Sequence, residues 1–117
     1  MSKTTTYGAG RNGHPRFYEL LDIIADLHHR KNYNYAKQGD PLSNFRMCEE
    51  FGIPATMGTM VRISDKYSRL TQLMKGKKDV VGESLKDTFM DMAVYSLLEI
   101  VLLEEEEDKA KKLQESP

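Results

Sequence analysis

Residues 82–107, GESLKDTFMDMAVYSLLEIVLLEEEE, decide the fold of this chain. Apolar residues recur at helical spacing on two sides of the stretch. They are Leu85, Phe89, Met92, Ala93 and Ile100 on one side, and Met90, Val94, Leu97, Leu98 and Val101 on the other. A helix that is apolar on two sides lies in the centre of a bundle or at a subunit interface. The stretch therefore predicts a central helix that begins near Gly82.

Three further stretches upstream have helical spacing. They run from Pro15 to about Arg30, from Ser43 to just before Gly52, and from Pro54 to about Lys75. The polar residues 31–42 between the first two are predicted to form a loop. No alternating strand pattern and no internal repeat occurs in the sequence. We therefore expect an all-α fold, a bundle of four to five helices.

The 117 residues, 39% of them hydrophobic, suit one domain with a real core. Residues 1–14 are polar and Gly-rich and are predicted to be a mobile N-terminal arm. The helical domain is expected over residues 15–103, and residues 104–117 form a charged C-terminal tail, into which the central helix can extend. The arm contains GAGRNG at 8–13. A dinucleotide-binding fingerprint of that form needs a preceding strand and a βαβ unit, which the sequence lacks.

Composition excludes several classes of protein. A formal net charge of −1 argues against direct DNA binding, which usually needs a basic excess. A single cysteine, Cys48, excludes an internal disulfide and a Cys-rich zinc site. No apolar run is long enough to span a membrane, and the N-terminus lacks the apolar core of a signal peptide. We expect a cytoplasmic protein.

Glu83, Asp87 and Asp91 are spaced four apart and therefore form one row on the predicted central helix. The row borders an apolar face, where three carboxylates repel one another and are costly to desolvate. A divalent cation would relieve both penalties, and hard oxygen ligands suit Mg²⁺ or Mn²⁺. The alternative is that this half of the helix is exposed, where acids favour the helix dipole.

Lys66 and Arg69 lie three apart on the third predicted helix, with Arg62 one turn earlier. Lysine point charges and arginine forks both recognise phosphate groups. The alternative is that Lys66 forms a buried ion pair with a carboxylate of the central helix. Both interpretations can hold for the protein without substrate.

Three segments carry a resemblance to a known family: KNYNYAKQGDPLSNFR at 31–46, DKYSRL at 65–70 and ESLKDTFMDMAVYSLL at 83–98. Together they resemble the small phage and bacterial proteins called nucleotide-modification-associated domain type one. Those proteins look like relatives of the MazG-like all-α NTP pyrophosphohydrolases. The resemblance covers roughly residues 16–101.

The resemblance implies a bundle of the all-alpha NTP pyrophosphatase type, forming a homodimer or homotetramer. It implies Mg²⁺-dependent cleavage of a (deoxy)nucleoside triphosphate to monophosphate and pyrophosphate, in phage or bacterial nucleotide-pool control. Matching positions make Glu83 and Asp87 catalytic metal ligands, with Asp91 a third ligand or a group that supports the ligands, and Lys66 a catalytic cation. The implied substrate-binding residues are Lys31, Asn32, Asn34, Tyr35, Asn44, Arg62, Lys66 and Arg69.

One feature of the MazG-like pattern is incomplete, because Glu49 and Glu50 are followed three residues later by Ile53 where that pattern has a glutamate. Two other classes of function stay open. One is a non-catalytic helical adaptor, in which the acid row pairs with the basic residues of the third helix. The other is a small DNA-binding regulator that uses the second and third helices, against which the near-neutral charge weighs.

Overall fold

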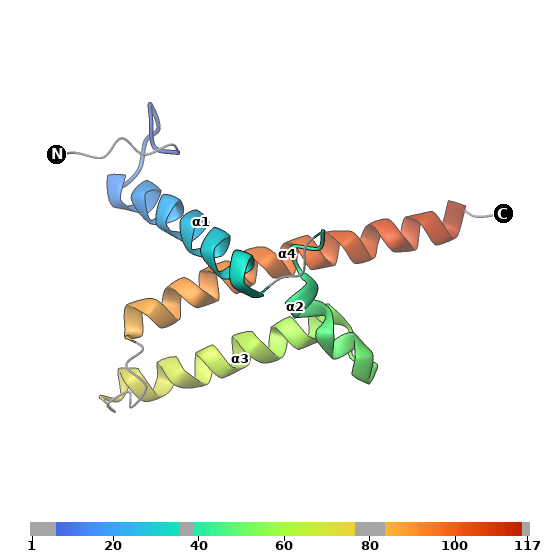
Figure 1. Ribbon diagram of the computed structural model, residues 1–117. Coiled ribbons are helices and arrows are strands. Elements are labelled where there is room, and N and C mark those ends of the chain that lie inside the picture. The colour runs from blue at the N-terminus through green and yellow to red at the C-terminus, as the bar shows by residue number, and fades with distance from the viewer. Residues whose placement is uncertain (1–6, 36–38, 77–83, 116–117) are drawn as a thin grey trace. The chain divides into compact units, whose positions relative to one another are not determined.

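The computed structural model describes residues 7–35, 39–76 and 84–115 (Figure 1). Every element in these ranges is a helix, which confirms the all-α prediction for them. The elements are α1 (Pro15–Tyr35), α2 (Ser43–Arg46), the 3-10 helix η1 (Met47–Phe51), α3 (Ala55–Met74) and α4 (Leu85–Glu115). They fall into two compact units, Met1–Leu42 and Ser43–Pro117.

In the first unit, α1 begins at Pro15 and is capped by the residue before it. The Nδ1 atom of His14 accepts a hydrogen bond from the backbone N–H of Arg16 at 3.0 Å. This satisfies one of the N–H groups that the first turn of a helix leaves without an intrahelical partner. The hydroxyl of Tyr18 donates to the carbonyl of Asn12, so the chain before α1 is tied to its first turn.

α1 is longer than predicted, and the loop expected at 31–42 is wrong for residues 31–35, which are helical. The physical reason is that these residues include no glycine or proline, so nothing interrupts the helix within them. The side-chain amide of Asn32 donates a hydrogen bond to the carbonyl of Pro41. The Asp40 carboxylate accepts one from the N–H of Leu42 at 3.1 Å, a turn of the kind that Asp commonly makes.

In the second unit, α3 and α4 lie side by side and run antiparallel (Figure 1). Near the start of α3, the hydroxyl of Thr56 donates to Glu106 at 2.8 Å. Further along α3, Lys66 lies 3.0 Å from Asp91. The buried residues of these two helices are Ala55, Thr59 and Leu70 on α3, and Thr88, Leu98, Glu99 and Leu102 on α4.

α2 and η1 cover the first part of α3. Phe45 is buried, and its ring meets that of Tyr95 edge to face, with the centroids 5.9 Å apart. The guanidinium of Arg62 lies over the same ring, 4.5 Å from its centroid, which is cation–π geometry. Arg46 forms an ion pair with Glu105 of α4 at 2.6 Å. The short helices are thus fixed to both long ones.

The charged segment expected to be a C-terminal tail is helical, since residues 104–115 are the last turns of α4. Its first residues have fixed partners in the contacts of Glu105 with Arg46 and of Glu106 with Thr56. At the other end of the chain, residues 1–6 of the predicted arm lie outside the described residues. Residues 7–10 form a turn, in which the N–H of Arg11 donates to the carbonyl of Gly8 at 3.2 Å. No helix in the described part of the chain is both long and apolar enough to cross a membrane.

η1 approaches α3 closely at Gly58. A Cβ atom placed on this glycine would lie 2.6 Å from the Sγ atom of Cys48. The Cys48 thiol also lies 3.7 Å from the carbonyl oxygens of Phe45 and Pro54, so its position is constrained on several sides. A glycine inside a helix costs about 1 kcal/mol relative to alanine. Here the cost is offset by the close contact that the missing side chain permits.

This contact predicts that the effect of Gly58→Ala depends on Cys48. In the parent chain we expect the free energy of unfolding to fall by about 1 kcal/mol, because the new methyl group overpacks the contact. In a Cys48→Ala background the same change is expected to raise it by roughly 0.5–1 kcal/mol, the usual gain in helix propensity. Urea denaturation of the four proteins measures both values, and equal effects in the two backgrounds would contradict the contact.

Candidate functional site

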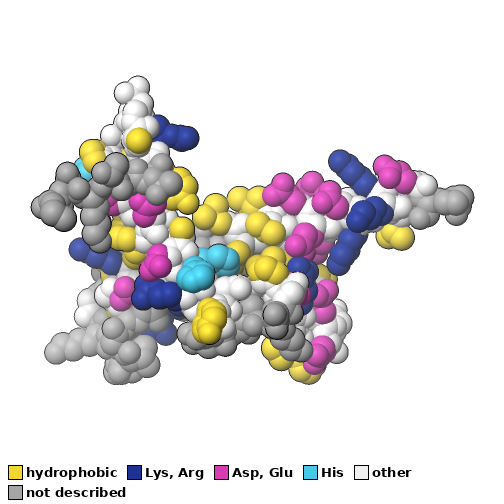
Figure 2. All heavy atoms as spheres, turned by 45° about the horizontal axis from the view of Figure 1, so that its top comes forward, with side chains coloured by type: hydrophobic (Ala, Val, Ile, Leu, Met, Phe, Trp, Pro, Cys, Tyr) yellow, Lys and Arg dark blue, Asp and Glu magenta, His cyan; other side chains and the backbone are white. Residues whose placement is uncertain are grey.

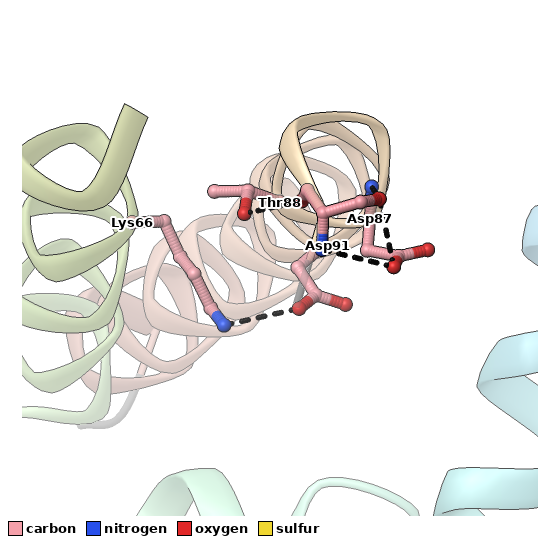
Figure 3. A network of polar contacts seen from close by, with 5 residues as sticks. Lys66, Asp87, Thr88 and Asp91 are labelled. Atoms are coloured by element: carbon pink, nitrogen blue, oxygen red, sulfur yellow. Dashed lines mark hydrogen bonds and ion pairs between the residues drawn. The ribbon is translucent and has the colours of Figure 1, made fainter. Parts of the chain in front are cut away.

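The centre of the candidate site is an ion pair between the two long helices. The Nζ atom of Lys66 on α3 lies 3.0 Å from Oδ2 of Asp91 on α4, as Figure 3 shows. Their side chains are 18% and 13% exposed. Antiparallel packing brings them together, since Lys66 lies one turn before the buried Leu70 and Asp91 one turn after the buried Thr88. The ion pair that the sequence offered as an alternative for Lys66 is therefore present, with both side chains largely but not fully buried.

Burial makes each charge of this pair depend on the other. A charged group that leaves water loses hydration, and only a close partner of opposite sign compensates for that loss. Removing one member alone would take this close opposite charge away from a largely desolvated group. The pair thus places one ammonium group and one carboxylate side by side between α3 and α4.

Asp87 has a different set of contacts, all within the first turn of α4 (Figure 3). Its Oδ2 atom accepts hydrogen bonds from the backbone N–H of Ser84 at 3.2 Å and from the Ser84 hydroxyl at 2.8 Å. The Ser84 hydroxyl oxygen in turn accepts the backbone N–H of Asp87 at 3.0 Å. This reciprocal arrangement is a capping box, with Ser84 as the N-cap. The pattern Ser84-x-x-Asp87 is visible in the sequence and could have predicted it.

The predicted row of three carboxylates is described only for two of its members. Glu83 lies outside the described residues. Asp87 is exposed, whereas Asp91 faces α3, because positions four apart on a helix drift by about 40°. In the described part of the chain, no group of three or more His, Cys, Asp or Glu side chains is placed to hold a metal ion.

Two predicted substrate-binding residues contact each other near the start of α3. The Nη2 atom of Arg62 donates a hydrogen bond to the backbone carbonyl of Asn44 at 3.1 Å, while its guanidinium covers the Phe45 ring. Arg62 thus helps to hold α2 on α3. Arg69 is half-buried and lies three residues after Lys66. Arg62, Lys66 and Arg69 form one basic row along α3.

The other predicted substrate-binding residues belong to the first unit. Lys31 is exposed on α1, and Asn32 is half-buried with its amide bonded to Pro41. Asn34 and Tyr35 are the last residues of α1. All four were predicted on a loop, and the structure places them on a helix.

Sequence reasoning missed one buried carboxylate. Glu99 is 8% exposed, and its Oε1 atom has no hydrogen-bond partner among the residues that the structure describes. Loss of hydration on burial raises the pKa of this carboxyl, and the nearby charge of Glu106 raises it further. A signal was present, because Glu99 is the one charged residue in the apolar run from 97 to 103.

An open groove lies at the opposite end of α4 from Asp91. It has a volume of about 380 Å³ and is lined by Arg46, Glu49, Glu105, Asp108, Lys109 and Lys112. Glu105 is about 20 Å from Asp91 along the helix, at a rise of about 1.5 Å per residue. Glu49 and Glu50 are both exposed in η1. Glu49 therefore belongs to this mixed-charge groove rather than to the carboxylates near Lys66.

Comparison of the chain with models of protein families, with curated proteins and with solved structures finds no match. The chemistry available at the site therefore follows from its side chains. Lysine and arginine on α3 can bind an anion, and the aspartates on α4 can bind a cation.

The ion pair predicts non-additive effects on stability. Lys66→Met alone and Asp91→Leu alone are each expected to lower the free energy of unfolding by roughly 2 kcal/mol, because each leaves a desolvated charge behind. The double variant is expected to lose less than either single change, since neither charge remains. Chemical denaturation of the parent and three variants gives the coupling energy. Strictly additive losses would show that the two groups do not interact.

Glu99 predicts a pH-dependent effect. Because its pKa is raised by folding, the folded state binds the proton more tightly, and stability is lost as the pH rises through the raised pKa. Glu99→Gln is therefore expected to raise the melting temperature at neutral pH, with a gain that shrinks below the ordinary pKa of a glutamate. Thermal unfolding from about pH 4 to about pH 8 measures this. The exposed Glu107→Gln is the control, and an equal gain there would refute the burial effect.

Proposed function

We propose that this chain is a Mg²⁺-dependent (deoxy)nucleoside triphosphate pyrophosphohydrolase that acts in phage or bacterial nucleotide-pool control. The observation that carries the proposal is the pairing of Lys66 with Asp91 between α3 and α4. It brings a cation of the type that binds phosphate beside a carboxylate of the type that binds Mg²⁺, in a setting that is largely shielded from water. The family resemblance of residues 31–46, 65–70 and 83–98 supports the same reaction.

The aspartates of α4 suit Mg²⁺ in chemical type. This ion takes hard oxygen ligands and is commonly held by one or two carboxylates together with substrate phosphates, rather than by a complete protein cage. Asp87 and Asp91 would supply those carboxylates, with Glu83 as the third member of the row. When bound, Mg²⁺ supplies charge neutralisation on the triphosphate and lowers the pKa of a coordinated water.

The basic residues of α3 would then bind the triphosphate. Asp91 would be one of the residues that hold the metal, and the ammonium group of Lys66 would donate to a phosphate oxygen, with Arg69 three residues further along α3. Water attacks the α-phosphorus, and the bond from that phosphorus to the α–β bridging oxygen breaks. The proton passes to a carboxylate near the site, and Lys66 and Arg69 stabilise the charge that develops on the leaving pyrophosphate.

The remaining substrate-binding residues of the proposal are Asn44 on α2 and Arg62 on α3 in the second unit, and four residues of α1 in the first unit. The α1 residues are Lys31, Asn32, Asn34 and Tyr35. Amide and aromatic side chains of this kind bind a sugar hydroxyl or stack on a base. They would select the nucleoside, whereas the charged residues of α3 and α4 would bind the part that all triphosphates share.

A second candidate function is a non-catalytic helical adaptor. One observation favours it: the contacts of Lys66 with Asp91 and of Ser84 with Asp87 each stabilise the helices in their own right. An adaptor needs those contacts for folding and makes no specific complex with Mg²⁺ or nucleotide.

Pyrophosphate release from a panel of dNTPs and NTPs, with Mg²⁺ and with EDTA, tests the proposal. We expect release from one or a few substrates, and only with the metal. Asp87→Asn and Lys66→Ala are expected to lower turnover by about 100-fold or more, the effect of removing a group that stabilises the transition state. Circular dichroism of each variant shows whether the helices remain.

Ser84→Ala is the matched control for Asp87→Asn. It breaks the same capping box, at a cost of about 1 kcal/mol, but keeps the carboxylate. Activity close to that of the parent in Ser84→Ala, together with its loss in Asp87→Asn, assigns the carboxylate to catalysis. Full activity in Asp87→Asn would refute the assignment, and silence of the folded parent across the panel would favour the adaptor.

A further inference from the structure

α4 carries a second regular pattern, on the side turned away from α3. Six positions recur at alternating intervals of four and three residues, the spacing of a coiled-coil seam. They are Lys86, Met90, Ala93, Leu97, Ile100 and Glu104, and we call them the outer seam. Its four central residues are apolar, its first is basic and its last is acidic.

The outer seam is separate from the surface that α3 covers. Residues that face α3, such as Thr88, Asp91 and Leu98, occupy the opposite side of the helix at 100° per residue. Leu97 and Ile100 are 52% and 53% exposed. Figure 2 shows hydrophobic side chains along the middle of α4 and acidic side chains nearer its C-terminal end. An apolar strip of this length on a helix usually marks an interaction site.

We propose that the outer seam docks on the same seam of a second copy of this chain, with the two α4 helices antiparallel. In coiled coils of that direction, an a position meets a d position of the other helix. Met90 then lies opposite Ile100 of the partner subunit, and Ala93 lies opposite Leu97 of the partner subunit. The two-fold axis of such a dimer generates each of these two pairs of residues twice. Each end closes with Lys86 opposite Glu104 of the partner subunit.

The charges at the two ends of the outer seam favour a second copy of the chain as the partner and favour an antiparallel pairing of the two α4 helices. In the antiparallel pairing, both ends of the seam place a lysine against a glutamate, so opposite charges meet twice. In a parallel pairing, Lys86 would face Lys86 of the partner subunit and Glu104 would face Glu104 of the partner subunit. Like charges placed opposite each other cost affinity and suppress that arrangement.

Side-chain size agrees with the antiparallel pairing. Each Ala93 lies against a Leu97 of the partner subunit, so a small residue accommodates a large one and the helices approach closely. A parallel pairing would set alanine against alanine and leucine against leucine. The helices would then be underpacked at the alanines and held apart by the leucines. The proposal is independent of the reaction, because none of these residues has a part in binding triphosphate.

Charge reversal tests the pairing on the full-length chain. Lys86→Glu and Glu104→Lys are each expected to raise the dissociation constant of the dimer about tenfold or more in analytical ultracentrifugation at low salt, because both ends of the interface then hold like charges. Carrying both changes in one chain restores opposite charges at both ends and is expected to restore the dimer. Lys75→Glu, an exposed lysine after α3, is the matched control.

Disulfide trapping tests the direction. In a Cys48→Ser background, chains with Met90→Cys mixed with chains with Ile100→Cys are expected to form a crosslinked heterodimer. Met90→Cys alone is expected to crosslink poorly, because ten residues of helix, about 15 Å, separate the two layers. Efficient crosslinking of Met90→Cys with itself would show a parallel pairing and overturn the proposal.

A chain that is monomeric at all concentrations would also overturn the proposal. So would a dimer whose dissociation constant is the same in the parent and in Lys86→Glu, because another surface would then form it. Neither result bears on pyrophosphate release, so failure of this proposal and failure of the proposed function can be distinguished.

Discussion

The ion pair of Lys66 with Asp91 fixes how the two long helices of this protein meet. Both groups are largely withdrawn from water, so any sliding of α4 along α3 that parts them leaves two desolvated charges. Apolar packing alone would tolerate other registers more easily, because the leucines along α4 are similar in size and shape. The polar contacts at Thr56 and Arg46 agree with the same register and extend it toward the C-terminal end of α4. Because a shift of this register costs free energy, the side chains of Lys66 and Asp91 keep fixed positions between the two helices.

Much of the fold was predictable because it depends on local spacing. The apolar stripes of α3 and α4, and the glycine that follows α3 at 76, are properties of short stretches. The helical end of α1 was not predicted, because its polar composition resembles that of a loop. The extension of α4 into residues 104–115 was foreseen as an open outcome, but its contacts with Arg46 and Thr56, which lie far away in the sequence, do not follow from local spacing.

The candidate site was predictable only in part, for two physical reasons. Spacing four apart places Asp87 and Asp91 in one row, but only a neighbouring helix decides which of them is covered. The acidic pattern also had two meanings, because a carboxylate near the start of a helix can cap it as well as bind a metal. Ser84, three residues before Asp87, was the clue to the capping box. The contact between Lys66 and Asp91 was foreseeable as one of two alternatives, since both lie beside apolar stripes.

α4 is about 46 Å long and α3 about 30 Å, so the C-terminal turns of α4 extend past the helix that packs against it. Three acid–lysine pairs in these turns are spaced four apart in the favourable direction: Glu105 with Lys109, Glu107 with Lys111, and Asp108 with Lys112. Attraction between such surface charges is screened by dissolved salt, whereas the packing of α3 on α4 is not. Dissolved salt therefore acts mainly on the last turns of α4, which depend on surface charges, and leaves the part packed on α3 largely unaffected.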